Sequence, residues 1–265
     1  MTSNRQDFFR PICRKLAAQL KRPELDKLVF LHLPKCGGTS LNAAFESIYT
    51  WRGHYTTSLD PRASKIASEI AGDSVQDFRV RILLYHLAQK QSHYLSGHYA
   101  YSEEVWDKFS HQWKFMTLLR EPVARWYSMY FYNKYKKGDH CRIHEPLKEF
   151  IESEAAQAAG NGYIRQLTAA QGANEDVERA ITNLQQFHLV GVLEELNTLV
   201  QDCKRMLGIN LDIGHRNFNP KTAREQSDEI TPEIDKRVRK ICEPNLRVYE
   251  SVRQRIAMHG SWLVE

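Results

Sequence analysis

Four short apolar runs, separated by amphipathic segments, set the pattern of this chain. They cover residues 28–33 (LVFLHL), 94–101 (YLSGHYAY), 113–120 (WKFMTLLR) and 187–192 (FHLVGV). Runs of this length, rich in aliphatic and aromatic residues, are typical of strands buried in a parallel sheet. The first, third and fourth runs lead directly into segments with helical spacing, so the order is strand followed by helix.

The helical segments carry recognisable start signals. Residues 40–49 repeat their apolar positions on one face, residues 121–135 have a proline in the first turn, and residues 196–207 place five apolar side chains on one side. The last helical stretch opens with Thr231 as N-cap and Pro232 as first helical residue. Strands alternating with helices predict an α/β fold whose central parallel sheet has helices on both faces.

The remaining segments are more polar. Residues 50–80 predict loops and a surface helix, residues 136–146 a basic loop, residues 147–171 helical structure interrupted at GNG, and residues 214–229 another polar loop. No repeat and no convincing linker divides the chain, so residues 28–265 are expected to form a single domain.

An amphipathic helix is expected within residues 1–27. From Pro11 onward the pattern is helical, and four apolar side chains recur four residues apart, at Phe8, Ile12, Leu16 and Leu20. The helix is expected to pack on the domain; a membrane-surface anchor is the alternative.

Composition and charge narrow the function only a little. The chain of 265 residues has 42% hydrophobic and 26% charged residues and a net charge of +5. No window is apolar enough to span a membrane, and the charged N-terminal residues do not resemble a signal peptide. Five cysteines without zinc-binding spacing favour a reducing compartment, so a cytoplasmic protein is expected. The modest positive charge favours an anionic ligand but does not indicate nucleic acid.

The strongest chemical pattern is the turn between the first strand and the first helix, with the sequence LPKCGGTS. Its glycines allow backbone N–H groups to point inward, the helix N-terminus supplies partial positive charge, and Thr39 and Ser40 add hydroxyl groups. Lys35 precedes the glycines, whereas the nucleotide-binding pattern GxxxxGK[ST] places its lysine after them. The turn therefore predicts an anion site of another kind; a glycine-rich turn without a ligand is the alternative.

A second basic element follows the third apolar run, in LLREPVARWYSMYFY. Arg120 stands at the carboxyl end of the predicted strand and Ser128 follows eight residues later, so both can reach one anion. The alternative is that Arg120 and Arg125 form surface ion pairs. The aromatic residues of the helix are expected to be core, namely Trp126, Tyr127, Tyr130 and Phe131.

Together these two segments resemble sulfotransferases. LPKCGGTS is similar to their loop for the 5′-phosphosulfate of 3′-phosphoadenosine 5′-phosphosulfate (PAPS), and LREPVARWYSMYF is similar to their 3′-phosphate element. The resemblance is to the carbohydrate group that includes the heparan sulfate 2-O- and 6-O-sulfotransferases and bacterial relatives. Weaker likenesses in NGYIRQL and HLVGVLEEL extend it from about residue 28 to about residue 207. The resemblance implies a P-loop-containing three-layer sandwich.

The resemblance also implies a role for each matching residue. Arg120 and Ser128 would hold the 3′-phosphate, and Lys35 would contact the oxygen that bridges sulfur and phosphorus. PAPS would be the donor and 3′-phosphoadenosine 5′-phosphate (PAP) the product, with no metal. The 5′-phosphosulfate would lie in the donor cradle, which we define as Lys35, Cys36, Gly37, Gly38, Thr39 and Ser40. The Cys36 side chain itself is expected only to fit the turn.

The attacking hydroxyl needs a general base. YLSGHYAY resembles the segment that carries histidine in the 2-O-sulfotransferase, so His98 is expected to be the base, with Glu46 as the alternative. That enzyme has histidine on both sides of the glycine, whereas here Ser96 precedes Gly97, so a second assisting imidazole is not predicted.

The sequence says less about the identity of the acceptor. Lys134, just before the basic loop, and Lys136 and Arg142 within it are candidates for binding an acidic acceptor, and a solvated loop is the alternative. Arg216, further on, is a candidate for closing over the nucleotide or the acceptor. The resemblance favours a carbohydrate hydroxyl; a small alcohol, a lipid-linked sugar or a tyrosine is also open. A kinase-like phosphotransferase and a non-catalytic binder of PAPS or sulfated glycans are the competing functions. No nucleic-acid partner is expected, and the oligomeric state is open.

Overall fold

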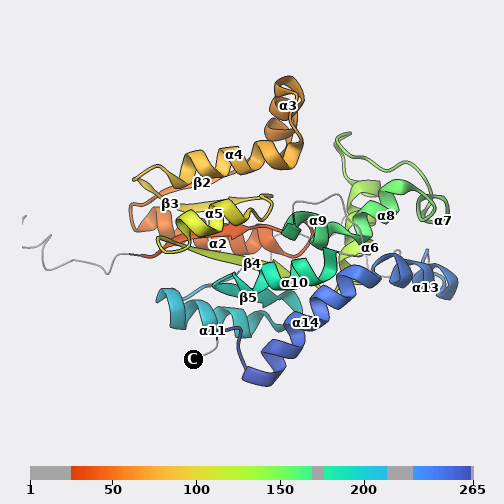
Figure 1. Cartoon of the computed structure of the whole chain (residues 1–265). Helices are drawn as coiled ribbons and strands as arrows, with labels where there is room; N and C mark the ends of the chain where they lie inside the picture. The colour runs from red at the N-terminus through yellow and green to blue at the C-terminus, as the bar shows by residue number, and fades with distance from the viewer. Residues whose placement is uncertain (1–24, 169–175, 214–228, 264–265) are drawn as a thin grey trace, which may run out of the picture.

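Five parallel strands form the centre of the fold. The computed structural model describes residues 25–168, 176–213 and 229–263, and within them the sheet has the order β2-β3-β1-β4-β5 (Figure 1). All four strand pairings are parallel. The predicted α/β fold is therefore confirmed. The strands are β1 (Lys27–Leu31), β2 (Tyr55–Ser58), β3 (Ser92–Gly97), β4 (Trp113–Leu119) and β5 (Leu189–Val192).

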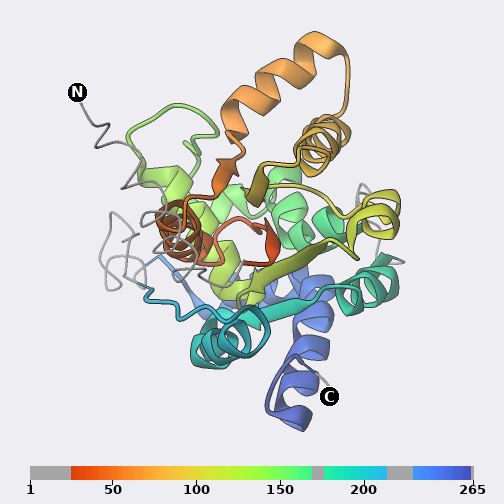
Figure 2. The same cartoon turned by 90° about the vertical axis from the view of Figure 1, so that its left-hand side faces the viewer.

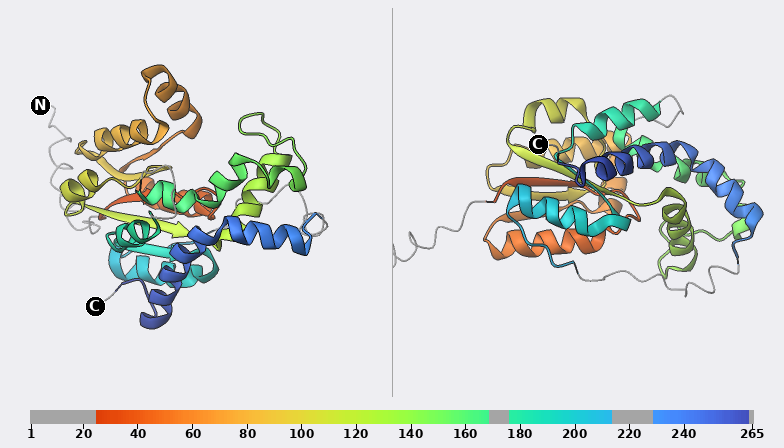
Figure 3. Two further views of the ribbon diagram at one scale, coloured as in Figure 1. Left: turned by 45° about the vertical axis from the view of Figure 1, so that its right-hand side comes forward. Right: turned by 90° about the horizontal axis from the view of Figure 1, so that it is seen from below.

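Alternating side chains of the strands supply a core on each face of the sheet. Val29 and Leu31 belong to one buried cluster, and Leu28 and Phe30 belong to the other. Helices α2 (Gly38–Trp51) and α11 (Leu196–Leu207) cover the second face (Figure 3). The first face is covered by α4 (Val75–Leu87), α5 (Glu103–Phe109), α9 (Gly162–Thr168), α10 (Val177–Gln185) and α14 (Glu243–His259).

A third buried cluster lies beyond the carboxyl ends of the strands, around α6. Trp126, Tyr130 and Phe131 of this helix are fully buried, which confirms that they are core residues. The predicted start of α13 is also confirmed, because the Thr231 hydroxyl accepts a hydrogen bond from the Ile234 amide. The helices of this cluster are α6 (Pro122–Tyr135), α7 (Leu147–Phe150), α8 (Glu154–Gly160) and α13 (Pro232–Ile241) (Figure 1).

The region 50–80 contains more structure than its sequence predicted. It holds the edge strand β2 and the helix α3 (Pro61–Ala71), which projects from the body of the protein together with part of α4 (Figures 1 and 2). β2 has the sequence YTTS, with exposed residues at both ends, so it shows no apolar run. Its pairing with β3, not its own hydrophobicity, makes it a strand.

The order in which strands are added to the sheet reverses at its centre, although all the strands stay parallel. From β1 the chain continues towards β2 on one side, and from β4 it continues to β5 on the other. The carboxyl ends of β1 and β4 therefore border the crevice where open α/β sheets bind ligands. The donor cradle follows β1 and Arg120 follows β4, so both predicted anion-binding elements lie at this position.

Two expectations lie partly or wholly outside the described residues. The helix expected within residues 1–27 falls almost entirely there, and the division into that helix and one domain over 28–265 stays a prediction. Across 25–168, 176–213 and 229–263 we find no helix with the length and apolar character needed to cross a membrane.

Candidate functional site

The turn after β1 has an unusual backbone. Lys35 adopts a left-handed conformation with φ of 68°, and so does Gly37 with φ of 79°. A left-handed lysine is uncommon, because its Cβ crowds the backbone, whereas glycine adopts this conformation easily. Gly37 is the N-cap of α2 and offers no side chain to cap the helix. The first amides of α2 therefore lie at the turn, in the arrangement that binds anions at helix N-termini.

Close packing also requires the two glycines. A Cβ at Gly38 would lie 2.2 Å from ring atoms of His32, and a Cβ at Gly37 would lie 2.8 Å from Cδ1 of Leu193. The Cys36 side chain points inward and is fully buried, with its Sγ 3.5 Å from the Tyr163 hydroxyl. Only the backbone of Cys36 is thus available to a ligand, whereas Thr39 is exposed.

Arg120 and Lys35 meet between the carboxyl ends of β1 and β4. Nη1 of Arg120 donates a hydrogen bond to the Lys35 carbonyl at 3.3 Å. Burial, with the neighbouring charges of Arg120 and Lys136, lowers the pKa of Lys35 to about 8. Neither Lys35 nor Arg120 forms an ion pair with a carboxylate in the described part of the chain. This concentration of positive charge is suited to an anionic ligand.

The α6 face that follows Arg120 belongs to the same site. The Nζ of Lys35 lies 3.5 Å from the ring centroid of Tyr132, which is 42% exposed. Ser128 precedes Tyr132 by one helical turn and is partly exposed, so the two side chains share a face of α6. Ser128 is therefore on the side of α6 that faces the donor cradle. A place for Tyr132 in the site was not predicted, because the other aromatic residues of this helix were expected to be core.

Arg125, unlike Arg120, is buried and stabilises the packing of α6 against its neighbours. It is only 6% exposed, and its Nη1 donates to the Ala159 carbonyl at 3.1 Å. Its guanidinium lies 4.9 Å from the ring centroid of Tyr163 and fills the space beside Gly162, where a Cβ would lie 1.9 Å from Nη2. The alternative of a surface ion pair is therefore wrong for Arg125.

On the other side of β1, the end of β3 places His98 beside the cradle. Nδ1 of His98 lies 2.6 Å from the His32 carbonyl oxygen. A carbonyl can only accept, so Nδ1 carries the proton and Nε2 keeps its lone pair. Burial, helped by the charge of Arg79, lowers the pKa of His98 against the opposing effect of the His32 hydrogen bond. The neutral ring that results at neutral pH can act as a base.

His32 supplies a second imidazole that sequence reasoning did not predict. Its ring centroid lies 4.7 Å from that of His98. Burial, then the charges of His98 and Lys35, lower the pKa of His32 to about 3, so this ring is neutral near pH 7. A histidine at the end of an otherwise apolar strand was the signal that could have revealed it.

Glu46 lies further along α2. It follows Gly38 by eight residues, about 12 Å of helix. Burial, and to a smaller degree the Glu46 carboxylate, raise the pKa of the Tyr94 hydroxyl, so this carboxylate lies near Tyr94. Tyr94 also donates to Asn42, one turn before Glu46, at 2.7 Å. Glu46 is thus beside this tyrosine network, and the structure records no contact between it and His98.

The side chains of the basic loop, and of Lys134 near the end of α6, bind mainly to the loop and to the end of α6. Lys134 donates to the carbonyls of His144 and Glu145, and Lys136 donates to Asn133 at 2.8 Å and to the His140 carbonyl. Arg142 lies 3.5 Å from Asp139 in an exposed ion pair. Of this group only Lys136 reaches the cradle electrostatically, through Lys35. Arg216 lies outside the described residues.

The described residues contain no group of three or more histidine, cysteine, aspartate or glutamate side chains placed to hold a metal ion.

Comparison with solved structures shows a distant structural likeness. No protein-family model matches the chain, and no curated protein matches it. The crystal structure of a sulfotransferase from Alicyclobacillus acidocaldarius is similar over 90% of this chain and 97% of its own, at 16% sequence identity and a TM-score of 0.41. Similarity at that level does not decide the function, which depends on the residues of the site.

Proposed function

We propose that this protein is a sulfotransferase that moves a sulfuryl group from PAPS to a hydroxyl group, with a carbohydrate as the acceptor. One observation carries the proposal. Lys35 and Arg120 follow the adjacent strands β1 and β4 and meet beside a helix N-terminus, where the strand order of the sheet reverses. In the described part of the chain no carboxylate neutralises them. Such a site favours a ligand with several negative charges.

The residues present fit such a donor. The amides at Gly37, Gly38 and Thr39 suit its 5′-phosphosulfate, because Gly37 is left-handed and α2 begins at Gly38. Arg120, with Ser128 on the adjoining face of α6, suits its 3′-phosphate, since an arginine fork matches phosphate oxygens. When bound, PAPS would supply the activated sulfuryl group. The resemblance of LPKCGGTS and LREPVARWYSMYF to sulfotransferase segments supports the same assignment.

His98 is the general base in this proposal, and Lys35 assists the leaving group. Nε2 of His98 takes the proton of the acceptor hydroxyl as a new oxygen–sulfur bond forms, while the bond from sulfur to the bridging oxygen breaks and PAP leaves. The Lys35 ammonium offsets the charge that develops on that oxygen. His98 is preferred to Glu46 because its ring lies beside His32, which packs on Gly38 of the cradle.

The competing functions make different demands. A P-loop kinase would need a lysine and hydroxyl placed after the glycines for nucleotide and magnesium, and this chain lacks that order. A non-catalytic binder would not need a base, yet His98 is held in the tautomer that leaves Nε2 able to accept a proton. The carbohydrate acceptor rests on the resemblance alone.

The direct test is transfer of labelled sulfate from PAPS to panels of glycans, small alcohols and tyrosine peptides. We expect product with at least one hydroxyl acceptor, more readily with glycans, and at least a hundredfold less with the His98→Ala variant. Transfer to small alcohols or peptides alone would refute the carbohydrate acceptor but not sulfuryl transfer. PAP binding without transfer to any panel would indicate a binding protein instead.

A further inference from the structure

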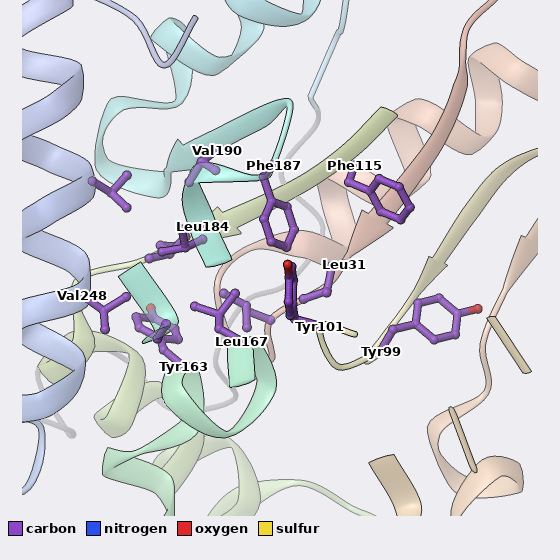
Figure 4. Close-up of a cluster of buried hydrophobic side chains, with 14 of the residues drawn as sticks. Leu31, Tyr99, Tyr101, Phe115, Tyr163, Leu167, Leu184, Phe187, Val190 and Val248 are labelled. Atoms are coloured by element: carbon purple, nitrogen blue, oxygen red, sulfur yellow. The ribbon is translucent and has the colours of Figure 1, made fainter. Parts of the chain in front are cut away.

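The short helix α9 contacts both halves of the candidate site. Four of its residues are buried, and Tyr163 and Leu167 lie in the core cluster that also contains Leu31 (Figure 4). Its sequence, within NGYIRQL, was not assigned a role by its pattern. Two of its polar side chains, Tyr163 and Gln166, nevertheless form hydrogen bonds with the backbone just after β1, β3 and β4.

Gln166 is the buried polar residue of α9. It is 4% exposed, and its Nε2 lies 3.1 Å from the His32 carbonyl and 2.9 Å from the Tyr99 carbonyl. Both partners can only accept, so the side-chain amide must present its NH₂ group to them, and both of its hydrogens are used. The backbone carbonyl of Gln166 accepts from the Tyr101 amide at 2.8 Å. This glutamine is thus fixed in one orientation.

The His32 carbonyl is shared between Gln166 and His98. It accepts from Nδ1 of His98 at 2.6 Å and from Nε2 of Gln166 at 3.1 Å. Gln166 also holds Tyr99, the residue after His98, while Arg79 donates to the His98 carbonyl at 3.3 Å. The backbone around His98 is therefore held from two directions.

We infer that Gln166 is a positioning residue for the base: it holds the His32 carbonyl that fixes the tautomer of His98. This inference rests on the proposed function. Replacing Gln166 by an apolar residue leaves two buried carbonyls each without one donor, and the His32 carbonyl is then no longer held against the His98 ring. The loss should appear in kcat, because Gln166 makes no recorded contact with the donor cradle.

Tyr163, one turn earlier on α9, provides a matched comparison. Its hydroxyl accepts from the Arg120 amide at 2.9 Å, donates to the Arg120 carbonyl at 2.5 Å and contacts Sγ of Cys36 at 3.5 Å. It therefore supports the donor side of the site. Two buried hydrogen-bonding side chains on one helix should affect different kinetic constants.

The test measures kcat, the KM for PAPS, the Kd for PAP and the Tm of Gln166→Met, Gln166→Glu and Tyr163→Phe. We expect Gln166→Met to lower kcat about tenfold and leave the PAP Kd within about twofold. Tyr163→Phe should weaken PAP binding with a smaller effect on kcat. In a His98→Ala background Gln166→Met should cause no further loss, because its effect passes through His98.

A spectroscopic measurement avoids dependence on turnover. Nitrogen–proton correlation spectra of the His98 ring should show the Nδ1–H tautomer in the wild type and a mixture of tautomers in Gln166→Met. Should Gln166→Met fail to fold, Gln166→Glu, which has a similar size but donates at most one hydrogen and none when ionised, should show the same change.

Three results would overturn the inference: an equal loss of kcat in the His98→Ala background, a loss confined to the KM for PAPS, or an unchanged His98 tautomer. A wild type that binds PAP but transfers no sulfate would refute the proposed function instead, while the tautomer spectra would still decide the role of Gln166.

Discussion

The two sides of β1 differ in charge. Towards β4, Lys35 and Arg120 are cationic, and burial together with Arg120 and Lys136 lowers the pKa of Lys35 to about 8. Towards β3, His32 and His98 are neutral rings in contact near pH 7; burial, then repulsion from a protonated His98 and from Lys35, lowers the pKa of His32 to about 3. One strand end thus separates a region that can bind an anion from a region that can remove a proton. Loss of the cationic side should impair donor binding, and loss of the neutral side should impair proton removal.

The largest effect should come from the neutral side. We expect His98→Ala to lower kcat at least a hundredfold, in line with general-base contributions of about 10² to 10⁴, while the PAP Kd stays nearly unchanged. Steady-state transfer assays and PAP titration measure the two constants. Retained turnover in this variant, with loss in Glu46→Ala, would assign the base to Glu46.

Lys35→Ala should weaken both donor binding and sulfuryl transfer. The ammonium would contact the donor and offset charge on the leaving oxygen, so kcat/KM should fall about a hundredfold. Lys134→Ala is the matched control, because Lys134 is bound to the His144 and Glu145 carbonyls, and should change kcat/KM less than about twofold. Equal losses in the two variants would remove the distinction between the cradle and the basic loop.

Arg120→Ala should act mainly on binding. Loss of a charge-assisted contact of about 1.5 to 3 kcal/mol predicts a PAP Kd weaker by about 10- to 150-fold. Calorimetry measures this directly, with adenosine 5′-phosphosulfate as a control ligand that lacks the 3′-phosphate. An equal loss for both ligands would show that Arg120 does not recognise the 3′-phosphate.

The two sides should respond to opposite limits of pH. PAP affinity should fall as the pH rises through about 8, because Lys35 then loses its proton. Lys35→Arg should abolish this dependence, since arginine stays charged. On the acid side, burial lowers the pKa of His98 below its ordinary 6.5, so kcat should fall only at lower pH, where the ring becomes protonated. A wild-type affinity that is constant to pH 10 would contradict the role of Lys35.

Among the residues of the donor cradle, the smallest effect should be that of Cys36→Ser. The thiol is buried against Tyr163, and a serine hydroxyl can make the same contact. Activity and PAP affinity should stay within about threefold of the wild type in the same assays. A loss comparable to that of Lys35→Ala would assign a chemical role to the thiol.

Local pattern predicted the elements that carry the donor side. β1, α2, β4 and α6 have long apolar or amphipathic signals, and the residues after β1 and β4 are polar, so the crevice between them was foreseeable. β2 was missed because its strand character comes from pairing with β3.

The buried contacts behind the candidate site could not be read from local pattern. His32, Tyr163 and Gln166 make contacts with residues far away in the sequence, and the Gln166 side chain reaches a carbonyl 134 residues away. A polar residue within an apolar helix or strand end is the only local sign of such contacts. The basic loop shows the converse: its charges suggested a binding surface, but the fold pairs most of them with the loop itself.

Calorimetric titration with PAP, compared with ATP in the presence and absence of magnesium, tests the central claim most directly. A site built from Lys35, Arg120 and the start of α2 should bind PAP in the micromolar range or tighter, without magnesium, and bind ATP much more weakly under either condition. Magnesium-dependent ATP binding at equal or higher affinity would contradict the account and favour a phosphotransferase.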